Sequence, residues 1–263
     1  MKELDQEEKM DNSKKKKKHL STRNMVLIGL LGAITVVLGQ TPLGFIPIGP
    51  LNATTMHIPV IIGAILEGPI VGAFVGLIFG LSSMFNAITR PTSPISFVFI
   101  NPLISVLPRV LIGFIAYYIF RALKNIEGKS LRILGSLVWI AIIGFLIRGV
   151  YQGASSGTLG VSFYLNIVFL IVSILLLILM NKQKAGNEAV MVSAFLTTMC
   201  HSLMVLGGIY LLFAEEYVEK MNIPLETARA TIMGALVTSG VPEGILAVIL
   251  STAILTAVWK AKK

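Results

Sequence analysis

Apolar runs of about twenty residues recur along almost the whole of this 263-residue chain. A run of that length, folded as a helix with a rise of about 1.5 Å per residue, crosses a hydrocarbon core of about 30 Å. With 55% hydrophobic and only 13% charged residues, the chain also carries more apolar surface than one soluble core can bury. The sequence therefore predicts an all-α polytopic protein of the inner or plasma membrane.

Hydropathy predicts about eight helices in this chain. They are expected near 25–39, 57–67, 69–86, 97–122, 131–150, 161–181, 189–213 and 240–259. The second is too short to cross alone and ends at Gly68-Pro69, where proline favours a break and a new helix start. We therefore expect a short helix and a longer one that meet at a turn on the cytoplasmic side.

Basic residues gather at one end of this arrangement, as the positive-inside rule requires of cytoplasmic segments. They are the lysine run 14–18, the group Arg121, Lys124, Lys129 and Arg132, the pair Lys182 and Lys184, and the terminal Lys260, Lys262 and Lys263. Both termini are therefore expected in the cytoplasm, and the loops near 40–56, 87–96, 151–160 and 214–239 outside. Residues 1–24 are predicted to be a disordered charged tail, and 25–263 a single transmembrane domain.

Several classes of protein find no support in the sequence. The single cysteine, Cys200, excludes a disulfide framework and a cysteine-based metal site. Signatures of zinc proteases, serine hydrolases and Walker A nucleotide sites are missing, so no enzyme activity, metal, cofactor or energy source is predicted. The net charge of +9 follows membrane topology, and no nucleic-acid partner is expected.

Arg109 is the charged residue most clearly placed inside the membrane, where a charge costs roughly 2.5–3.5 kcal/mol and usually has a task. Asn101-Pro102 is typical of a helix start, which puts Arg109 roughly 10 Å below the outer end of that helix. Pro108 leaves the carbonyl of Ile104 without its usual partner. Arg109 is expected either to bind an anionic group of a ligand or to pair with Glu243.

Other polar residues cluster on three segments. Glu243 follows Pro242 at a helix start, where a carboxylate suits the positive end of the helix dipole. His201 lies with Thr197, Thr198 and Ser202 near mid-depth, and His57 follows Asn52 and Thr54 at the mouth of the second helix. A structural hydrogen bond and a ligand contact remain open for both histidines.

Small residues at a spacing of four indicate close helix packing in lipid. Gly72, Gly76 and Gly80 form such a stripe, for which internal packing is the favoured interpretation. Gly29 and Ala33 form another on the first helix, where internal packing and a partner interface remain alternatives.

The ordered motifs of this chain resemble a known family. They are TPLGF (41–45), IPVIIGAIL (58–66), GP (68–69), GLSS (80–83), NP (101–102), PR (108–109), LGGIYLLF (206–213) and PE (242–243). In this order they resemble the substrate-binding S components of energy-coupling factor (ECF) vitamin transporters, closest to the pantothenate-type subgroup. The resemblance covers about 25–122 and 189–259.

The resemblance implies a six-helix subunit without its own ATPase that captures a vitamin with high affinity and docks on a transmembrane T component driven by two ATPases. It also implies that Gly29 and Ala33 contact the T component. The first outer loop, with Pro47, Pro50, Asn52 and Thr54, would gate the site. The substrate-binding residues are then expected to be Asn52, Thr54, His57, Asn101, Arg109, Thr198, His201 and Glu243.

The segment 125–188 departs from the six-helix pattern by two extra helices. This inserted hairpin could pack outside the bundle, add substrate contacts or replace part of a partner interface. Pantothenate is the favoured substrate, with riboflavin, folate and other vitamins as alternatives. An autonomous ion-coupled carrier that uses Glu243 or His201 as a relay, and an intramembrane transferase acting on lipids, are the other functions that we consider.

Overall fold

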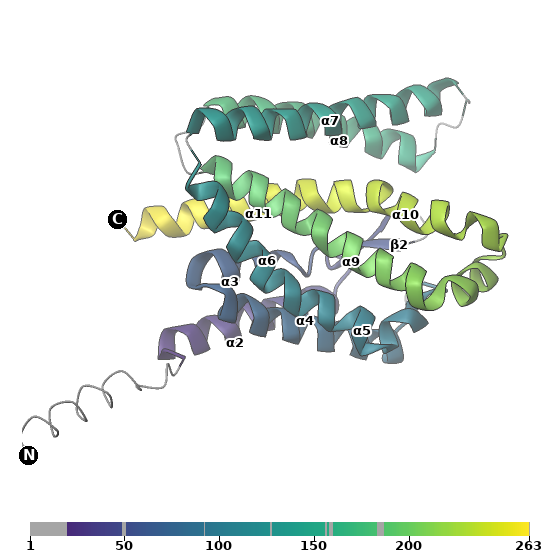
Figure 1. Ribbon diagram of the computed structural model, residues 1–263, viewed down its shortest axis with the longest axis horizontal. Coiled ribbons are helices and arrows are strands. Elements are labelled where there is room, and N and C mark those ends of the chain that lie inside the picture. The colour runs from purple at the N-terminus through teal and green to yellow at the C-terminus, as the bar shows by residue number, and fades with distance from the viewer. Residues whose placement is uncertain are drawn as a thin grey trace, which may run out of the picture.

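The computed structural model describes residues 20–48, 51–91, 93–126, 128–155, 157, 160–182 and 187–262. Within them, seven helical segments are long and apolar enough to cross a membrane, and the apolar helix α3 (Ile58–Glu67) is shorter. The predicted fold class, an all-α polytopic membrane protein, is confirmed, and Figure 1 shows the helices running together as a bundle. The lysine run 14–18, Pro50 and Lys184 lie outside the described residues.

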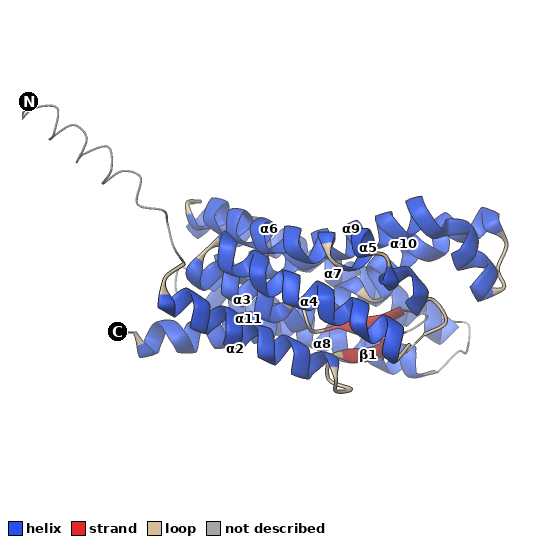
Figure 2. Cartoon of the chain, turned by 90° about the horizontal axis from the view of Figure 1, so that it is seen from below, coloured by secondary structure: helices blue, strands red, loops and turns tan. Residues whose placement is uncertain are grey.

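The order of elements follows the predicted spans closely. The helices are α2 (Thr22–Gly39), α3, α4 (Pro69–Thr89), η1 (Ser96–Ile100), α5 (Pro102–Ser105), α6 (Leu107–Lys124), α7 (Gly128–Ser155), α8 (Val161–Lys182), α9 (Asn187–Met221), η2 (Leu225–Thr227), α10 (Ala228–Thr238) and α11 (Gly240–Ala261). Between α2 and α3, the strands β1 (Phe45–Ile48) and β2 (Leu51–Thr54) pair as an antiparallel hairpin, which the sequence analysis did not predict. Figure 2 shows this hairpin in red.

The predicted break between the second and third segments is confirmed at Gly68. Its φ of 101° lies in the left-handed region that favours glycine, and Pro69 then starts α4. Glu67, just before the break, forms ion pairs with Arg23 at 2.5 Å and with Lys262 at 3.9 Å. The starts of α2 and α4 and the end of α11 therefore meet at one end of the bundle. The positive-inside rule assigns this end to the cytoplasm, and we call it the cytoplasmic end.

The glycine stripe of α4 brings this helix into backbone contact with α6 and the turn before it. A Cβ on Gly76 would collide with the carbonyl of Arg109, and a Cβ on Gly80 would lie 2.7 Å from the Cα of Val106. Gly72 meets Gly113 in the same way. The predicted internal packing role is confirmed, and it fixes the backbone that carries Arg109.

Two helix boundaries differ from the prediction. The span expected over 97–122 is divided into η1, α5 and α6, because Pro108 cannot donate to the carbonyl of Ile104. The predicted outer loop 214–239 is wrong: α9 continues to Met221 after a kink at Phe213, and α10 follows. Glutamates lower the hydropathy there, yet Tyr217 and Ile232 are buried in a small second core.

The helices α7 and α8 form a hairpin that lies along one side of the bundle (Figure 1). The buried face of α7 holds it to α9, where the rings of Trp139 and Phe195 lie 6.1 Å apart. At the cytoplasmic end, Arg132 donates to Glu188 at 2.9 Å. In these contacts the hairpin packs on the outside of the bundle, and its role in a partner interface stays a prediction.

Candidate functional site

A cavity of about 60 Å³ lies in the half of the bundle away from the cytoplasmic end. Its lining comes from the segment before α3, from η1 and from the outer parts of α6, α9, α10 and α11. The lining residues are Thr54, Phe99, Arg109, His201, Ser202, Val205, Leu206, Ala235, Ser239, Gly240 and Glu243. None of them comes from the α7–α8 hairpin, so this hairpin adds no contact to the described lining.

Glu243 connects the first outer segment to the cavity. It lies in the first turn of α11, where the helix dipole favours a negative charge. Its carboxylate accepts from the backbone N–H of Thr54 at 2.7 Å and from the hydroxyl of Ser202 at 3.2 Å. Only 6% of Glu243 is exposed, so these two hydrogen bonds stabilise the carboxylate in place of solvent.

Arg109 lies in the first turn of α6 and is buried, with 4% of its surface exposed. Its guanidinium donates to the carbonyl of Ile104, the acceptor that Pro108 leaves free. The rings of Phe79 and Phe99 each lie 5.2 Å from the guanidinium carbon, a distance typical of cation–π contacts. Its Nε has no hydrogen-bond partner among the described residues, so part of the fork is available to a ligand.

The expected ion pair between Arg109 and Glu243 is not formed among the described contacts. The two residues line the same cavity, and each binds other groups. The site therefore holds one cation and one anion that are buried near each other without a direct bond. Such a site favours a polar ligand with separate anionic and hydrogen-bonding groups.

Two histidines extend the site toward α3. The rings of His57 and His201 stack with their centroids 5.7 Å apart, and His201 also contacts Phe79 at 5.8 Å. His57 hydrogen-bonds Thr198 across 3.1 Å through its Nε2. Both ring nitrogens of His201 are buried without a hydrogen-bond partner in the described part of the chain. An orphaned buried donor or acceptor costs about 1–3 kcal/mol, which a bound ligand would recover.

Six of the expected substrate-binding residues gather here, namely Thr54, His57, Arg109, Thr198, His201 and Glu243. Asn101 does not line the cavity, because its side chain caps α5 by accepting from the N–H of Leu103 at 2.9 Å. The backbone of Asn52 belongs to β2, and its side chain lies outside the described residues. Gly29 and Ala33 are exposed on α2, and a Cβ added to Gly29 meets no atom within 4 Å.

The site also has aromatic and apolar walls that the sequence did not indicate. Phe79 and Phe99 hold the guanidinium, and Val205 and Leu206 form an apolar wall one turn beyond His201. In a chain with 13 phenylalanines, no local pattern marks these two as site residues. The spacing of Val205 to His201, four positions on one helix, was the available signal.

His57, His201 and Glu243 offer one ligand atom each within 4.8 Å of one another, a grouping that could hold a metal ion. Two observations disfavour a cation there. The carboxylate of Glu243 already accepts two hydrogen bonds, and the guanidinium of Arg109 lines the same cavity. Positive charge so close weakens cation binding, so the donor set suits an organic ligand better.

Comparison with known proteins finds one matching family and two similar proteins. The model of the family described as "ECF transporter, substrate-specific component" matches residues 23–255. The chain is 36% identical over 96 residues to the pantothenic acid transporter PanT of Lactococcus lactis, which covers 31% of this chain and 48% of that protein. It is 32% identical over 152 residues to the pantothenate transporter PanT of Leuconostoc mesenteroides, which covers 52% of this chain and 74% of that protein. The first match thus spans about half the length of that relative.

Proposed function

Because the chain belongs to the substrate-specific component family of ECF transporters, we propose that it captures pantothenate at the outer face of the plasma membrane. The chain is a multi-pass membrane protein, and the family consists of transport components and not of enzymes. The two relatives named for pantothenate support the choice among vitamins.

The observation that carries this proposal is the buried guanidinium of Arg109 at the cavity wall. Pantothenate has one carboxylate, one amide and two hydroxyl groups. The free part of the arginine fork binds the carboxylate, and Glu243 and His201 exchange hydrogen bonds with the hydroxyl and amide groups. The geminal dimethyl group of the ligand then lies against the apolar wall of Val205 and Leu206.

Binding requires the first outer segment to move. A cavity of about 60 Å³ is far smaller than the roughly 300–1,000 Å³ of ordinary small-molecule sites. Thr54 lines the cavity from the segment that carries the β1–β2 hairpin, and its N–H binds Glu243. This segment acts as the gate, which opens when the Thr54–Glu243 hydrogen bond breaks and closes over the bound vitamin.

Membership of the ECF transporter family implies partners that hydrolyse ATP, and the sequence itself holds no Walker A motif. The proposed partners are a transmembrane T component and two ATPase subunits. Gly29 and Ala33 are the proposed contact on this chain, because both are exposed and a partner helix can approach a small-xxx-small surface closely.

The test is a comparison of two ligands by calorimetry on the purified protein. Pantothenate should bind tightly, and panthenol, which has a hydroxymethyl group in place of the carboxylate, should bind at least about tenfold more weakly. Arg109→Ala should remove this preference by weakening pantothenate alone. Equal binding of both ligands by the unmodified protein would contradict the role of Arg109, and no binding of either would contradict the choice of pantothenate.

A further inference from the structure

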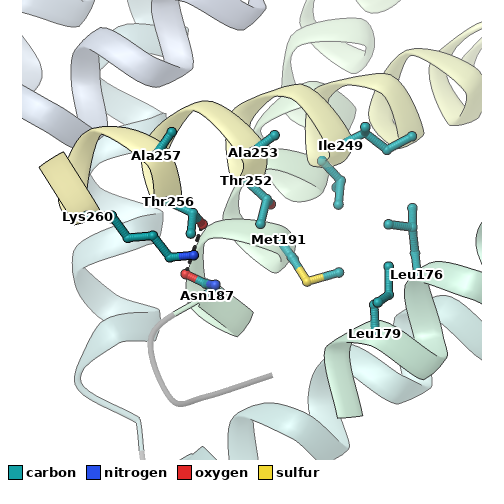
Figure 3. Close-up of a pocket in the computed structure, with 11 residues that line it drawn as sticks. Leu176, Leu179, Asn187, Met191, Ile249, Thr252, Ala253, Thr256, Ala257 and Lys260 are labelled. Carbon is teal, nitrogen blue, oxygen red and sulfur yellow. Dashed lines mark hydrogen bonds between the residues drawn. The ribbon is translucent and has the colours of Figure 1, made fainter. Parts of the chain in front are cut away.

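A second cavity, of about 390 Å³, opens between the α7–α8 hairpin and the bundle at the cytoplasmic end. Figure 3 shows α11 on one side of it and Leu176 and Leu179 of α8 on the other, with Met191 of α9 between them. The α7–α8 hairpin contacts the bundle through α7 against α9 and through α8 against α11 and α9, and the cavity lies among α8, α9 and α11. We call this cavity the hairpin groove.

The hairpin groove changes from apolar to polar along its length. Val248 and Ile249 line its deep end, and Ala253 and Ala257 leave space along α11. Asn187, Thr256 and Lys260 lie at the cytoplasmic end, where Thr256 donates to Asn187 at 3.4 Å. This is the polarity of a phospholipid, with the headgroup at Lys260 and an acyl chain along the alanines.

The length of the groove matches one leaflet of a membrane. From Val248 to Lys260, α11 rises roughly 18 Å, and half of a hydrocarbon core of about 30 Å is about 15 Å. Leu179, Ala253 and Ala257 are exposed at the groove, so lipid chains around the bundle can reach it. A soluble metabolite would meet mostly aliphatic side chains and few hydrogen-bonding groups.

The positive charge of Lys260 at the cytoplasmic end of the groove favours an anionic headgroup. Lys260 is exposed, makes no ion pair among the described residues, and is the charged residue of the lining. Two charged residues near this end form ion pairs instead: Lys262 pairs with Glu67 at 3.9 Å, and Glu188 pairs with Arg132 at 2.9 Å. Basic pockets between helices on the cytoplasmic side bind anionic headgroups.

We propose that the hairpin groove is a binding site for one anionic phospholipid of the cytoplasmic leaflet. The acyl chain lies against Ala253 and Ala257, and the phosphate accepts from Lys260. The lipid thereby fills the gap between α8 and α11. This site shares no lining residue with the proposed vitamin site, the cavity lined by Arg109 and Glu243, which we call the vitamin cavity.

The test is native mass spectrometry of the full-length protein, delipidated in detergent and titrated with phosphatidylglycerol or phosphatidylcholine. Phosphatidylglycerol should bind with a dissociation constant about fivefold lower, which corresponds to one lysine near the headgroup. Lys260→Gln should remove this preference. Lys262→Gln is the matched control, since it removes the same charge from the residue that pairs with Glu67, and it should keep the preference.

A second variant tests the acyl path without touching the charge. Ala253→Leu with Ala257→Leu should lower the retention of both lipids, and pantothenate binding and the melting temperature should stay within the range of the unmodified protein. Equal affinity for the two lipids in the unmodified protein would overturn the proposal. So would a leucine variant that keeps phosphatidylglycerol but fails to join the T component, because the groove would then be a protein interface.

Discussion

The backbone N–H of Thr54 and the carboxylate of Glu243 meet at 2.7 Å, although 189 residues separate them in the chain. This hydrogen bond joins the outer segment before α3 to the first turn of the last helix. It is a contact between an uncharged backbone donor and a buried carboxylate, at the cavity that we propose as the vitamin site. A hydrogen bond to a charged group contributes about 1.5–3 kcal/mol, enough to hold a gate closed and still allow it to open.

The first prediction concerns this hydrogen bond. Glu243→Ala should raise the exchange rate of the Thr54 amide at least about tenfold, because the N–H loses its acceptor. Glu243→Gln keeps an oxygen in the same place and should raise it much less. Hydrogen exchange measured by mass spectrometry on peptides over 51–57 checks both, in the absence of ligand. Equal protection in the alanine variant would show that other contacts close the gate.

The second prediction concerns Arg109. Arg109→Lys should keep the charge but lose the planar fork and its contacts with Phe79 and Phe99, and should weaken pantothenate binding roughly tenfold or more. Calorimetry gives the affinity, and a thermal melt in detergent reports folding. Arg121→Lys makes the same change at the cytoplasmic end of α6 and is the control, which should leave both values unchanged. An Arg109→Lys protein with unchanged affinity would remove Arg109 from the binding site.

The third prediction concerns the contact of α4 with α6. Gly76→Ala should destabilise the protein by about 1–3 kcal/mol, because the added Cβ collides with the carbonyl of Arg109. It should weaken ligand binding as well, since the same backbone positions the guanidinium. Gly29→Ala is the matched control, because its Cβ meets nothing within 4 Å. Thermal melts of both variants in detergent give the comparison, and equal melting temperatures would contradict the packing role.

The fourth prediction concerns the proposed T-component interface. Gly29→Leu or Ala33→Leu should prevent copurification with the T component, because a bulky side chain keeps the partner helix away. Pantothenate affinity should not change, since α2 does not line the vitamin cavity. Gly234→Leu, which also meets nothing within 4 Å of its Cβ but lies on α10, is the control. Normal copurification of the α2 variants would remove this assignment.

Much of the bundle could be predicted because hydropathy reports directly on burial in lipid. The break at Gly68-Pro69 and the start at Asn101-Pro102 were also predictable, since each depends on a backbone property of glycine, proline or a capping side chain. The β1–β2 hairpin was missed because each strand has only four residues, and because FIPI lacks an alternation of polar and apolar residues and contains a proline. The helical parts of 214–239 were missed because glutamates lowered the mean hydropathy without ending the helix.

The site was predictable where a charge had no other reason to be in the membrane. Arg109, His201 and Glu243 stood out on that ground, and the structure brings them to one cavity. Asn101 was expected both to start a helix and to bind substrate, and its side chain is occupied as the helix cap. Phe79 and Phe99 could not be selected, because an aromatic side chain in an apolar helix is the ordinary case and its role depends on tertiary contact.

The short helix α3 fills the interior of the bundle on the cytoplasmic side of the cavity. His57 stands at its outer end beside the vitamin cavity, and below it every residue from Ile58 to Ile65 is buried in the main core. Among the described residues, the buried side chains of α3 fill the space between His57 and Glu67. A ligand held in the cavity therefore has no direct route past α3 toward the cytoplasm unless these side chains move.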